Sequence, residues 1–305
     1  EMLRSLVGSE MCIRDRDIYI PDGRNVGHVE YIHGGVSRNV VEDIANIELR
    51  PTFVGIVDDS ALGEDVVKKL KNHKVNTDYV MTRPGGMGTW LAVFDHNGDL
   101  AGSISQRPNL MPILGLLEEK GDEIFANADS VIVEVDMDKD IIKKVVALAK
   151  QYNKKLYGVV SNMSIAVERR DFLKHFDCFI CNQLEAGMLF MEDYADKSPE
   201  ELRDILSKRV ILGKIPAMIV TMGGNGAVYA DVNGEKGICP PQRVRVKDTT
   251  GAGDAFCAGV ASGLTYGKTL SEAVEIGSRL AASVITSSEN VCPRFLPEEF
   301  GITLD

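Results

Sequence analysis

Residues 248–256 read DTTGAGDAF, in which two carboxylates flank a stretch with almost no side chains. The preceding RVRVKD predicts a strand and the following AFCAGVASGLTY predicts a helix, so we expect this stretch at a strand-to-helix turn. The first backbone N–H groups of a helix have no internal partners, and the helix dipole makes the same place electropositive. Small residues leave those amides open to an anion, and here they are Gly251, Ala252 and Gly253.

The turn lacks the Lys and the Ser or Thr that complete a P-loop, so any anion site here is of another kind. The residues alone leave a structural alternative open. In that alternative the glycines only turn the chain, and Asp254 only complements the helix dipole.

The stretch GGVSRN (34–39) offers a second candidate site, at the start of the expected helix SRNVVEDIANI. Gly34 and Gly35 would let the backbone approach a polyhydroxylated ligand, and the Asn39 amide can both donate to hydroxyls and accept from them. A glycine turn that merely precedes the helix would explain the same residues.

Two further stretches follow expected strands. In NQLE (182–185), Asn182 and Glu185 have the spacing of a capping box, so a structural role competes with any ligand role. TMGGNGA (221–227) contains a glycine pattern that could equally be a hairpin turn into the AVYA that follows.

Short apolar runs alternate with amphipathic helices from residue 52 onward. The runs are typical of strands covered on both faces of a parallel sheet: TFVGIV (52–57), VIVEV (131–135), KLYGVV (155–160), DCFIC (177–181) and AMIVTM (217–222). Helical patterns lie between them, and Ser198 and Thr269 have the signals of helix N-caps. The alternation predicts an α/β fold of three layers, a doubly wound and mostly parallel sheet with helices on both faces.

Two β-rich segments without helices, at about 17–33 and 78–106, predict a small sheet that stands off the main domain as a lid. In the second, GTWLAVFDHNGDLAGSI has the pattern of a hairpin around Asn97-Gly98. Residues 1–16 show no strand or helix periodicity and resemble a translated library adapter, so we expect a non-native segment there and the functional domain over 17–305.

Composition narrows the function. The net charge of −11 disfavours nucleic-acid and anionic-membrane partners, which require surplus Lys and Arg, but leaves room for a small anionic ligand. Six cysteines in 305 residues do not form a disulfide framework, so we expect a cytoplasmic protein. Cys178 and Cys181 form a C-x-x-C, but on a strand they would point to opposite faces as packed thiols.

DTTGAGDAF closely resembles the C-terminal signature of the ribokinase-like, or phosphofructokinase-B type, carbohydrate kinases. GGVSRN, NQLE and TMGGNGA are similar to that family's Gly-Gly-x-x-x-Asn, Asn-x-x-Glu and Thr/Ser-x-Gly-x-x-Gly, in the same order along the chain. The resemblance implies that Asp254 is a general base and that the Gly251-Ala252-Gly253 amides form an anion hole for the transferring phosphoryl group. The chemistry agrees, because an attacking alcohol must lose a proton and a nearby carboxylate can accept it.

The resemblance also implies roles for other residues. ATP would be bound by Thr221, Gly223, Gly226 and, near the adenine, Ser278. Sugar hydroxyls would be bound by Gly34, Gly35, Asn39 and Asp17, with Asp15 and Asp22 as rivals to Asp17. Mg²⁺ would lie near Asn182 and Glu185 through water, and a monovalent cation such as K⁺ near Asp248 and Thr250.

We therefore expect an ATP-dependent kinase that acts on a hydroxyl of a sugar or of a ribose-containing nucleoside, with a homodimer through the lid. GGVSRN and GTWLAVFDHNGD look most similar to pseudouridine kinases. A catalytically degenerate kinase fold that binds nucleotide or sugar as a regulator is the alternative, because GVVSN stands where relatives often have Asp-Pro. A dinucleotide-dependent oxidoreductase is disfavoured, since no G-x-G-x-x-G follows an early strand.

Overall fold

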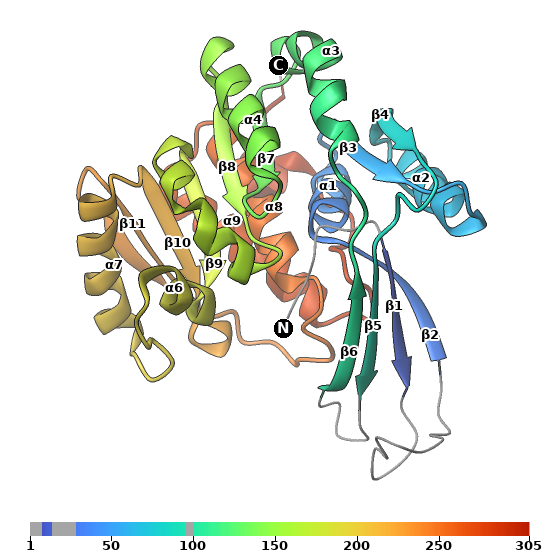
Figure 1. Cartoon of the computed structure of the whole chain (residues 1–305). Coiled ribbons are helices and arrows are strands. Elements are labelled where there is room, and N and C mark those ends of the chain that lie inside the picture. The colour runs from blue at the N-terminus through green and yellow to red at the C-terminus, as the bar shows by residue number, and fades with distance from the viewer. Residues whose placement is uncertain (1–7, 14–28, 95–99, 305) are drawn as a thin grey trace.

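The computed structural model describes residues 8–13, 29–94 and 100–304, and its largest element is a six-stranded sheet (Figure 1). The strands of this main sheet are β7 (Ser130–Glu134), β8 (Lys155–Val159), β9 (Cys178–Asn182), β10 (Ala217–Thr221), β11 (Ala227–Asp231) and β12 (Lys236–Cys239). Their order is β12-β11-β10-β9-β8-β7. Strands β7 to β10 pair in parallel, whereas β11 and β12 pair antiparallel. Each of the four parallel strands coincides within a residue with an apolar run of the sequence.

Helices cover both faces of the main sheet, as the alternating pattern predicts. One face packs on α3 (Pro112–Ala126), α4 (Lys139–Gln151), α6 (Gln183–Phe190) and α7 (Pro199–Gly213). The other face packs on α1 (Val36–Asn46), α8 (Ala252–Thr265) and α9 (Leu270–Ile285). Cys178 belongs to the second of these cores and Cys181 to the first, so the C-x-x-C thiols are packed on opposite faces, as expected. The three-layer fold is confirmed.

A separate pair of parallel strands, β3 (Thr52–Val57) and β4 (Asn76–Thr82), is joined by α2 (Ala61–Asn72). Their own core contains Phe53, Leu70 and Met87 together with Val41 of α1. The sequence interpretation placed the stretch from residue 78 in the peripheral sheet, but β4 pairs with β3 instead. The physical reason is the helix between them, because a strand–helix–strand unit brings its two strands together in parallel.

Four strands form a peripheral sheet that extends away from the body of the protein (Figure 1). They are β1 (Gly8–Ile13), β2 (Val29–Gly34), β5 (Thr89–Phe94) and β6 (Leu100–Gln106), in the order β2-β1-β5-β6. β5 and β6 pair antiparallel on either side of Asn97-Gly98, and that turn lies outside the described residues. The strand at Gly8–Ile13 lies where the sequence showed no periodicity. The non-native origin of residues 1–16 stays a prediction.

One expected strand is absent from the described residues: RVRVKD (243–248) pairs with no neighbouring strand. Val244 and Val246 are exposed, so the alternation of valine with charged residues does not reflect a buried face. A backbone hydrogen bond from Lys247 N–H to the Ile285 carbonyl oxygen, at 2.8 Å, holds the segment beside the end of α9. The expectation was wrong because alternation alone does not supply a partner strand.

The helix starts follow their local signals. Ser198 caps α7 and Thr269 caps α9, each in a complete capping box with a Glu three residues later. The remaining short helical segments are α5 (Met163–Ala166) and the 3₁₀ turns η1 (Val167–His175), η2 (Gly223–Asn225) and η3 (Pro297–Phe300).

Helices α8 and α9 are in backbone contact. A Cβ on Gly259 of α8 would lie 2.7 Å from Cα of Gly277 in α9, and a Cβ on Gly277 would lie 2.6 Å from the Phe256 carbonyl oxygen. Every residue of α8 from Asp254 to Gly263 is buried. Helix α8, whose first turn carries the Gly-Ala-Gly stretch, is therefore enclosed from Asp254 onward and packed tightly against α9.

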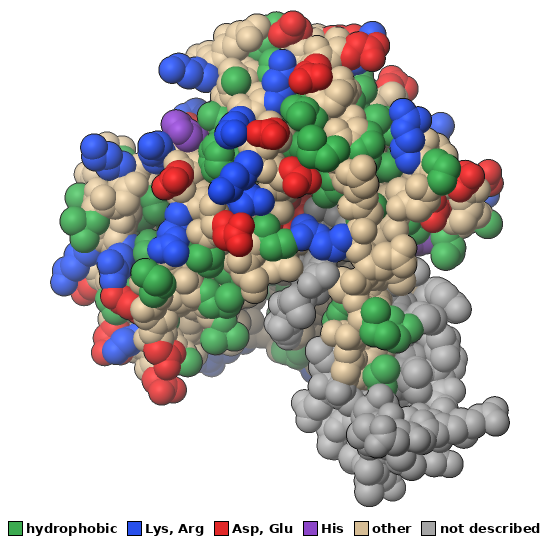
Figure 2. Space-filling model, viewed as in Figure 1, with side chains coloured by type: hydrophobic (Ala, Val, Ile, Leu, Met, Phe, Trp, Pro, Cys, Tyr) green, Lys and Arg blue, Asp and Glu red, His purple; other side chains and the backbone are tan. Residues whose placement is uncertain are grey.

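Acidic and basic side chains are intermixed over the face of the body shown in Figure 2. Within the described residues, no helix combines the length and the apolar character that crossing a membrane requires.

Candidate active site

Gly251 turns the chain into α8. It is the N-cap residue, with φ 79° and ψ −8°, and a Cβ at this position would lie 1.9 Å from the Asn290 carbonyl oxygen. Both the left-handed backbone and the contact therefore require glycine. Gly253 differs, because it is exposed and nothing lies within 4 Å of a Cβ built on it. The first turn of α8 is thus open to a ligand at Gly253.

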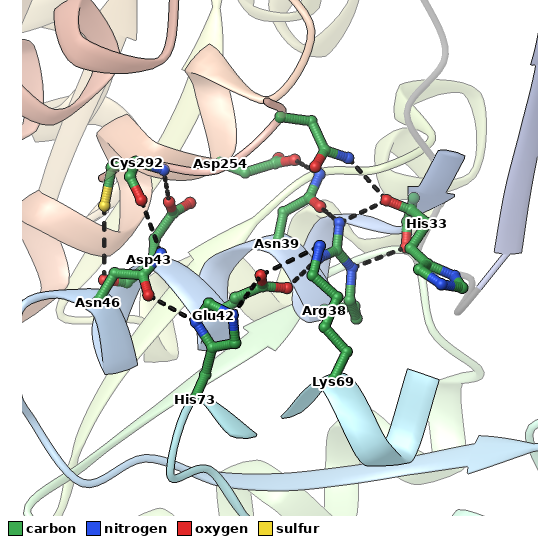
Figure 3. A network of polar contacts seen from close by, with 12 residues as sticks. His33, Arg38, Asn39, Glu42, Asp43, Asn46, Lys69, His73, Asp254 and Cys292 are labelled. Atoms are coloured by element: carbon green, nitrogen blue, oxygen red, sulfur yellow. Dashed lines mark hydrogen bonds and ion pairs between the residues drawn. The ribbon is translucent and has the colours of Figure 1, made fainter. Parts of the chain in front are cut away.

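Asp254, in the first turn of α8, meets Asn39 of α1 (Figure 3). The Asn39 Nδ2 donates to Asp254 Oδ2 at 2.6 Å, and the two residues are 0% and 3% exposed. These two residues lie 215 positions apart, in the two stretches that the sequence indicated as separate candidate sites. The fold brings them together.

Gly34 and Gly35 shape the entry to α1. Gly34 ends β2, and Gly35 is the N-cap of α1 with φ 100°. Both are buried, and the Asn39 N–H donates to the Gly35 carbonyl oxygen at 2.8 Å. The glycine turn thus sets the position of Asn39. Asp17, together with its rivals Asp15 and Asp22, lies outside the described residues.

Two buried carboxyl groups at the end of β7 were missed by the sequence analysis, and the first of them, Glu134, interacts electrostatically with Asp254. Glu134 ends β7 and Asp136 follows it, at 1% and 2% exposure. Burial, and secondarily the charge of Asp136, raises the pKa of Glu134 to about 8, and burial also raises the pKa of Asp136. The Ser37 N–H donates to Glu134 Oε1 at 3.0 Å. The available signal was an acid inside an apolar run, VIVEV, at the carboxyl end of a strand.

Asp136 connects the main sheet to the segment that leaves the peripheral sheet. Arg107, directly after β6, has its Nη2 3.4 Å from Asp136 Oδ2, while the Ser161 N–H donates to Asp136 Oδ1 at 3.1 Å. The carboxylate therefore fixes the loop after β8 and pairs with the base of the peripheral sheet.

Of two cavities among the described residues, one is lined by residues of the candidate site and the other is not. A small one, of about 40 Å³, is lined by Ser37, Arg38 and Glu134 together with side chains of β3 and the segment after β6. A larger one, of about 490 Å³, lies at the ends of α1 and α2 around Arg50, and none of the motif residues lines it. The small cavity is the one that bears on the site, because it is lined by Glu134, which interacts electrostatically with Asp254.

The nucleotide-side candidates lie along one edge of the main sheet. Thr221 is the last residue of β10 and is paired in register with Asn182, the last residue of β9. Gly226, with φ 87°, turns the chain from β10 into the antiparallel β11, and a Cβ there would lie 2.1 Å from the Cys239 carbonyl oxygen. Gly223, with φ 53°, lies in open space, since a Cβ added there would meet nothing within 4 Å, and Ser278 is half-buried on α9. The glycine pattern therefore forms the hairpin turn between β10 and β11 that the sequence offered as its structural role.

Asn182 and Glu185 form a complete capping box at the start of α6. The Glu185 N–H donates to Asn182 Oδ1 at 2.9 Å, and the Asn182 N–H donates to Glu185 Oε2 at 2.7 Å. Among the described residues, no group of three or more His, Cys, Asp or Glu side chains is placed to hold a metal ion. Any Mg²⁺ at this edge would therefore depend on water and phosphate oxygens for most of its ligands.

Asp248 and Thr250 form a local turn before Gly251. The Thr250 N–H donates to Asp248 Oδ1 at 2.9 Å, the arrangement of an Asx-turn. This contact accounts for Asp248 structurally. It leaves the cation role that the resemblance implies as a prediction.

Comparisons with known proteins identify the family of the chain. The family described as "pfkB family carbohydrate kinase" matches residues 7–292. A guanosine-inosine kinase of Exiguobacterium acetylicum is 35% identical over 277 residues, 88% of each chain, and a pseudouridine kinase of Escherichia coli (strain K12) is 23% identical over 273 residues, 86% of this chain and 82% of the kinase. A structure of Arabidopsis thaliana ribokinase complexed with ribose and ATP is 18% identical, with a TM-score of 0.79 and full coverage of both chains. The chain is accordingly a member of the pfkB family of carbohydrate kinases, which makes it a sugar or nucleoside kinase.

Proposed function

We propose that this kinase transfers the γ-phosphate of ATP to a ribose hydroxyl of a nucleoside. The observation that carries the proposal is the buried Asp254 carboxylate, held 2.6 Å from the Asn39 amide beside an open helix start. The 35% identity to a guanosine-inosine kinase favours a purine nucleoside as the acceptor. Pseudouridine, which the sequence alone favoured, comes second.

In the proposed reaction Asp254 accepts the proton of the acceptor hydroxyl. The oxygen then attacks the γ-phosphorus, and the bond from that phosphorus to the β,γ-bridging oxygen breaks to release ADP. The amides of the Gly251-Ala252-Gly253 turn would stabilise the charge on the phosphoryl oxygens in the transition state. The openness at Gly253 supports this role, because a phosphate can reach the amides there without displacing a side chain.

The acceptor end of the site is rich in carboxyl groups. Glu134 lies close enough to Asp254 for their charges to interact, and Asp136 follows on the same strand end. Carboxyl groups accept hydrogen bonds from hydroxyl groups, and a protonated one such as Glu134 can also donate, so a ligand rich in hydroxyls, such as a ribose, suits this end.

Mg²⁺ is proposed at the ends of β9 and β10, near Asn182 and Glu185, where it would supply charge neutralisation for the ATP phosphates. The capping box supports a mainly water-mediated site, because it already occupies the only side-chain oxygen of Asn182 and one of the two carboxyl oxygens of Glu185. Thr221, Gly223, Gly226 and Ser278 are proposed to bind the nucleotide. K⁺ near Asp248 and Thr250, a homodimer through the peripheral sheet and a cytoplasmic location stay predictions.

The test is ATP consumption with a panel of guanosine, inosine, pseudouridine, adenosine, ribose and fructose. We expect phosphorylation of at least one nucleoside, and a loss of at least ~100-fold in kcat/KM for Asp254→Asn, the lower range for removing a general base. Asp177→Asn is the matched control, since Asp177 accepts from the Leu156 N–H at the amino edge of the same sheet. Wild-type turnover in Asp254→Asn would refute the mechanism, and nucleotide binding without any turnover would favour the regulator.

A further inference from the structure

A buried ion pair lies directly behind Asn39. Arg38 and Glu42, one turn apart on α1, are 1% and 0% exposed, and Arg38 Nη1 donates to Glu42 Oε2 (Figure 3). Two buried charges carry a large desolvation cost, which only good geometry and further hydrogen bonds offset. Apolar residues at these two positions of α1 would avoid this cost in folding free energy. Such a pair calls for an explanation beyond stability.

The further hydrogen bonds of Arg38 point to that explanation. Its Nη2 donates to Asn39 Oδ1 and to the His33 carbonyl oxygen, the latter at 2.6 Å, and its Nε donates to the Gly34 carbonyl oxygen at 3.2 Å. One guanidinium thus holds the end of β2, the start of α1 and the Asn39 side chain together.

The bond to Asn39 decides which way its amide faces. An amide has an oxygen that accepts and a nitrogen that donates, and Arg38 has donors only. Because the guanidinium occupies Oδ1, the Nδ2 group must point the other way, to Asp254 Oδ2 at 2.6 Å. The reversed amide would set its oxygen against a carboxylate and its N–H groups against the guanidinium, so both contacts would be lost.

The same network reaches the loop that covers the Gly251 turn. Asn290 Nδ2 donates to the His33 carbonyl oxygen at 2.7 Å, the oxygen that Arg38 also binds. The Asn290 backbone is the one that approaches Gly251 most closely. Arg38 is therefore connected by hydrogen bonds to Asp254 through Asn39, and to the residue packed on Gly251 through the His33 carbonyl.

We propose that Arg38 is a positioning residue for phosphoryl transfer, which locks the Asn39 amide so that it orients the Asp254 carboxylate toward the acceptor hydroxyl. This inference rests on the proposed function in assigning Asp254 as the base. Glu42 neutralises the buried guanidinium, and on its other oxygen it faces Lys69 Nζ at 3.3 Å and His73 Nε2 at 3.5 Å, both from the α2 side. Lysine cannot replace Arg38, because its single nitrogen cannot reach the four separate oxygens that the planar guanidinium binds.

The experiment removes the pair as a unit. Arg38→Met alone would leave Glu42 as a buried unpaired charge and endanger folding, whereas Arg38→Met with Glu42→Leu replaces both charges by apolar groups of similar volume, which is often neutral for stability. We expect this double variant to melt near the wild type, to keep its KM for ATP within about twofold, and to lose about 10- to 100-fold in kcat, the scale of a misplaced catalytic group.

A double-mutant cycle separates positioning from general structure. If Arg38 acts through Asn39, adding the Arg38→Met and Glu42→Leu changes to Asn39→Ala lowers kcat by no more than about twofold further. Multiplicative losses would overturn the proposal. Arg38→Lys with Glu42 intact should have a kcat between that of the wild type and that of the Arg38→Met, Glu42→Leu double variant. Arg209→Met, which removes a surface partner of Glu192, is the control and should keep wild-type kcat.

A second readout needs no turnover. The Asn39 side-chain NH₂ resonance, assigned by its loss in Asn39→Ala, should exchange slowly with solvent in the wild type and much faster in the Arg38→Met, Glu42→Leu variant. Equal exchange in both would refute the orienting role even if the enzyme phosphorylated nucleosides. Slow wild-type exchange with no phosphorylation of any nucleoside would instead overturn the proposed function and keep the orienting role.

Discussion

Replacing Gly251 by alanine should destabilise the protein through a clash with the Asn290 backbone. The added Cβ would lie 1.9 Å from the Asn290 carbonyl oxygen, so the two atoms must separate by at least 1.1 Å to reach the 3.0 Å at which such contacts begin. Asn290 is 6% exposed and its side chain is bound to the His33 carbonyl. It therefore cannot move away without breaking other contacts.

Two costs add for this variant. A residue with a Cβ in the left-handed conformation costs about 1–2 kcal/mol, and overpacking a buried site costs about 1–3 kcal/mol more. We therefore expect Gly251→Ala to lower the free energy of unfolding by roughly 2–5 kcal/mol, and Tm by roughly 3–8 °C. Gly253→Ala, two residues on, meets nothing within 4 Å and should be neutral or stabilising by up to about 1 kcal/mol, since alanine favours a helix.

Urea denaturation and thermal melts of the two variants beside the wild type provide the measurement. ATP consumption below both melting points then shows whether the Gly251→Ala turn still works, and we expect turnover to fall further than the unfolded fraction explains. If Gly251→Ala melted like Gly253→Ala, the close approach of Asn290 to this turn would be refuted.

Three further predictions concern the rest of the molecule. Because the folded protein holds the Glu134 proton more tightly than the unfolded chain, with a pKa of about 8 against 4.5, the free energy of unfolding should fall as pH rises between these values, and Glu134→Gln should remove roughly 2–4 kcal/mol of that fall in urea titrations at pH 5 and 8. Ser198→Ala should cost about 1 kcal/mol in thermal melts through loss of the α7 cap, whereas Ser207→Ala within the same helix should not. Burial raises the pKa of Cys178 and of Cys181, so peptide mapping after thiol labelling should find both unmodified until the protein is unfolded, and labelling of the native protein would contradict their packing.

The strands and helices of the main sheet could be predicted because their signals are local. KLYGVV became β8, AMIVTM became β10, and both capping boxes appear where Ser198 and Thr269 predicted them. RVRVKD failed for the opposite reason, since a strand also needs a neighbour and the sequence pattern contains no information on one.

The site could be predicted only in part. The Gly-Ala-Gly turn and Asn39 were found as separate motifs, but their contact spans 215 residues and no local pattern contains it. Glu134 lies within the apolar run VIVEV, which the sequence analysis read only as a buried strand, so the acid was not considered as a site residue. Arg38 was passed over because a charged residue on a helix is usually assigned to the surface, and only the fold shows that it is enclosed.

The glycine-to-glycine contact between α8 and α9 has a consequence for motion during the reaction. Where Gly259 meets Gly277 backbone lies against backbone, so no flexible side chain at that point could give way and let α8 slide along α9. Asp254, the proposed proton acceptor in the first turn of α8, is thus expected to stay in place during the reaction. Any rearrangement that admits a substrate or releases a product is then expected in the elements around α8 and α9 rather than in the contact between these two helices.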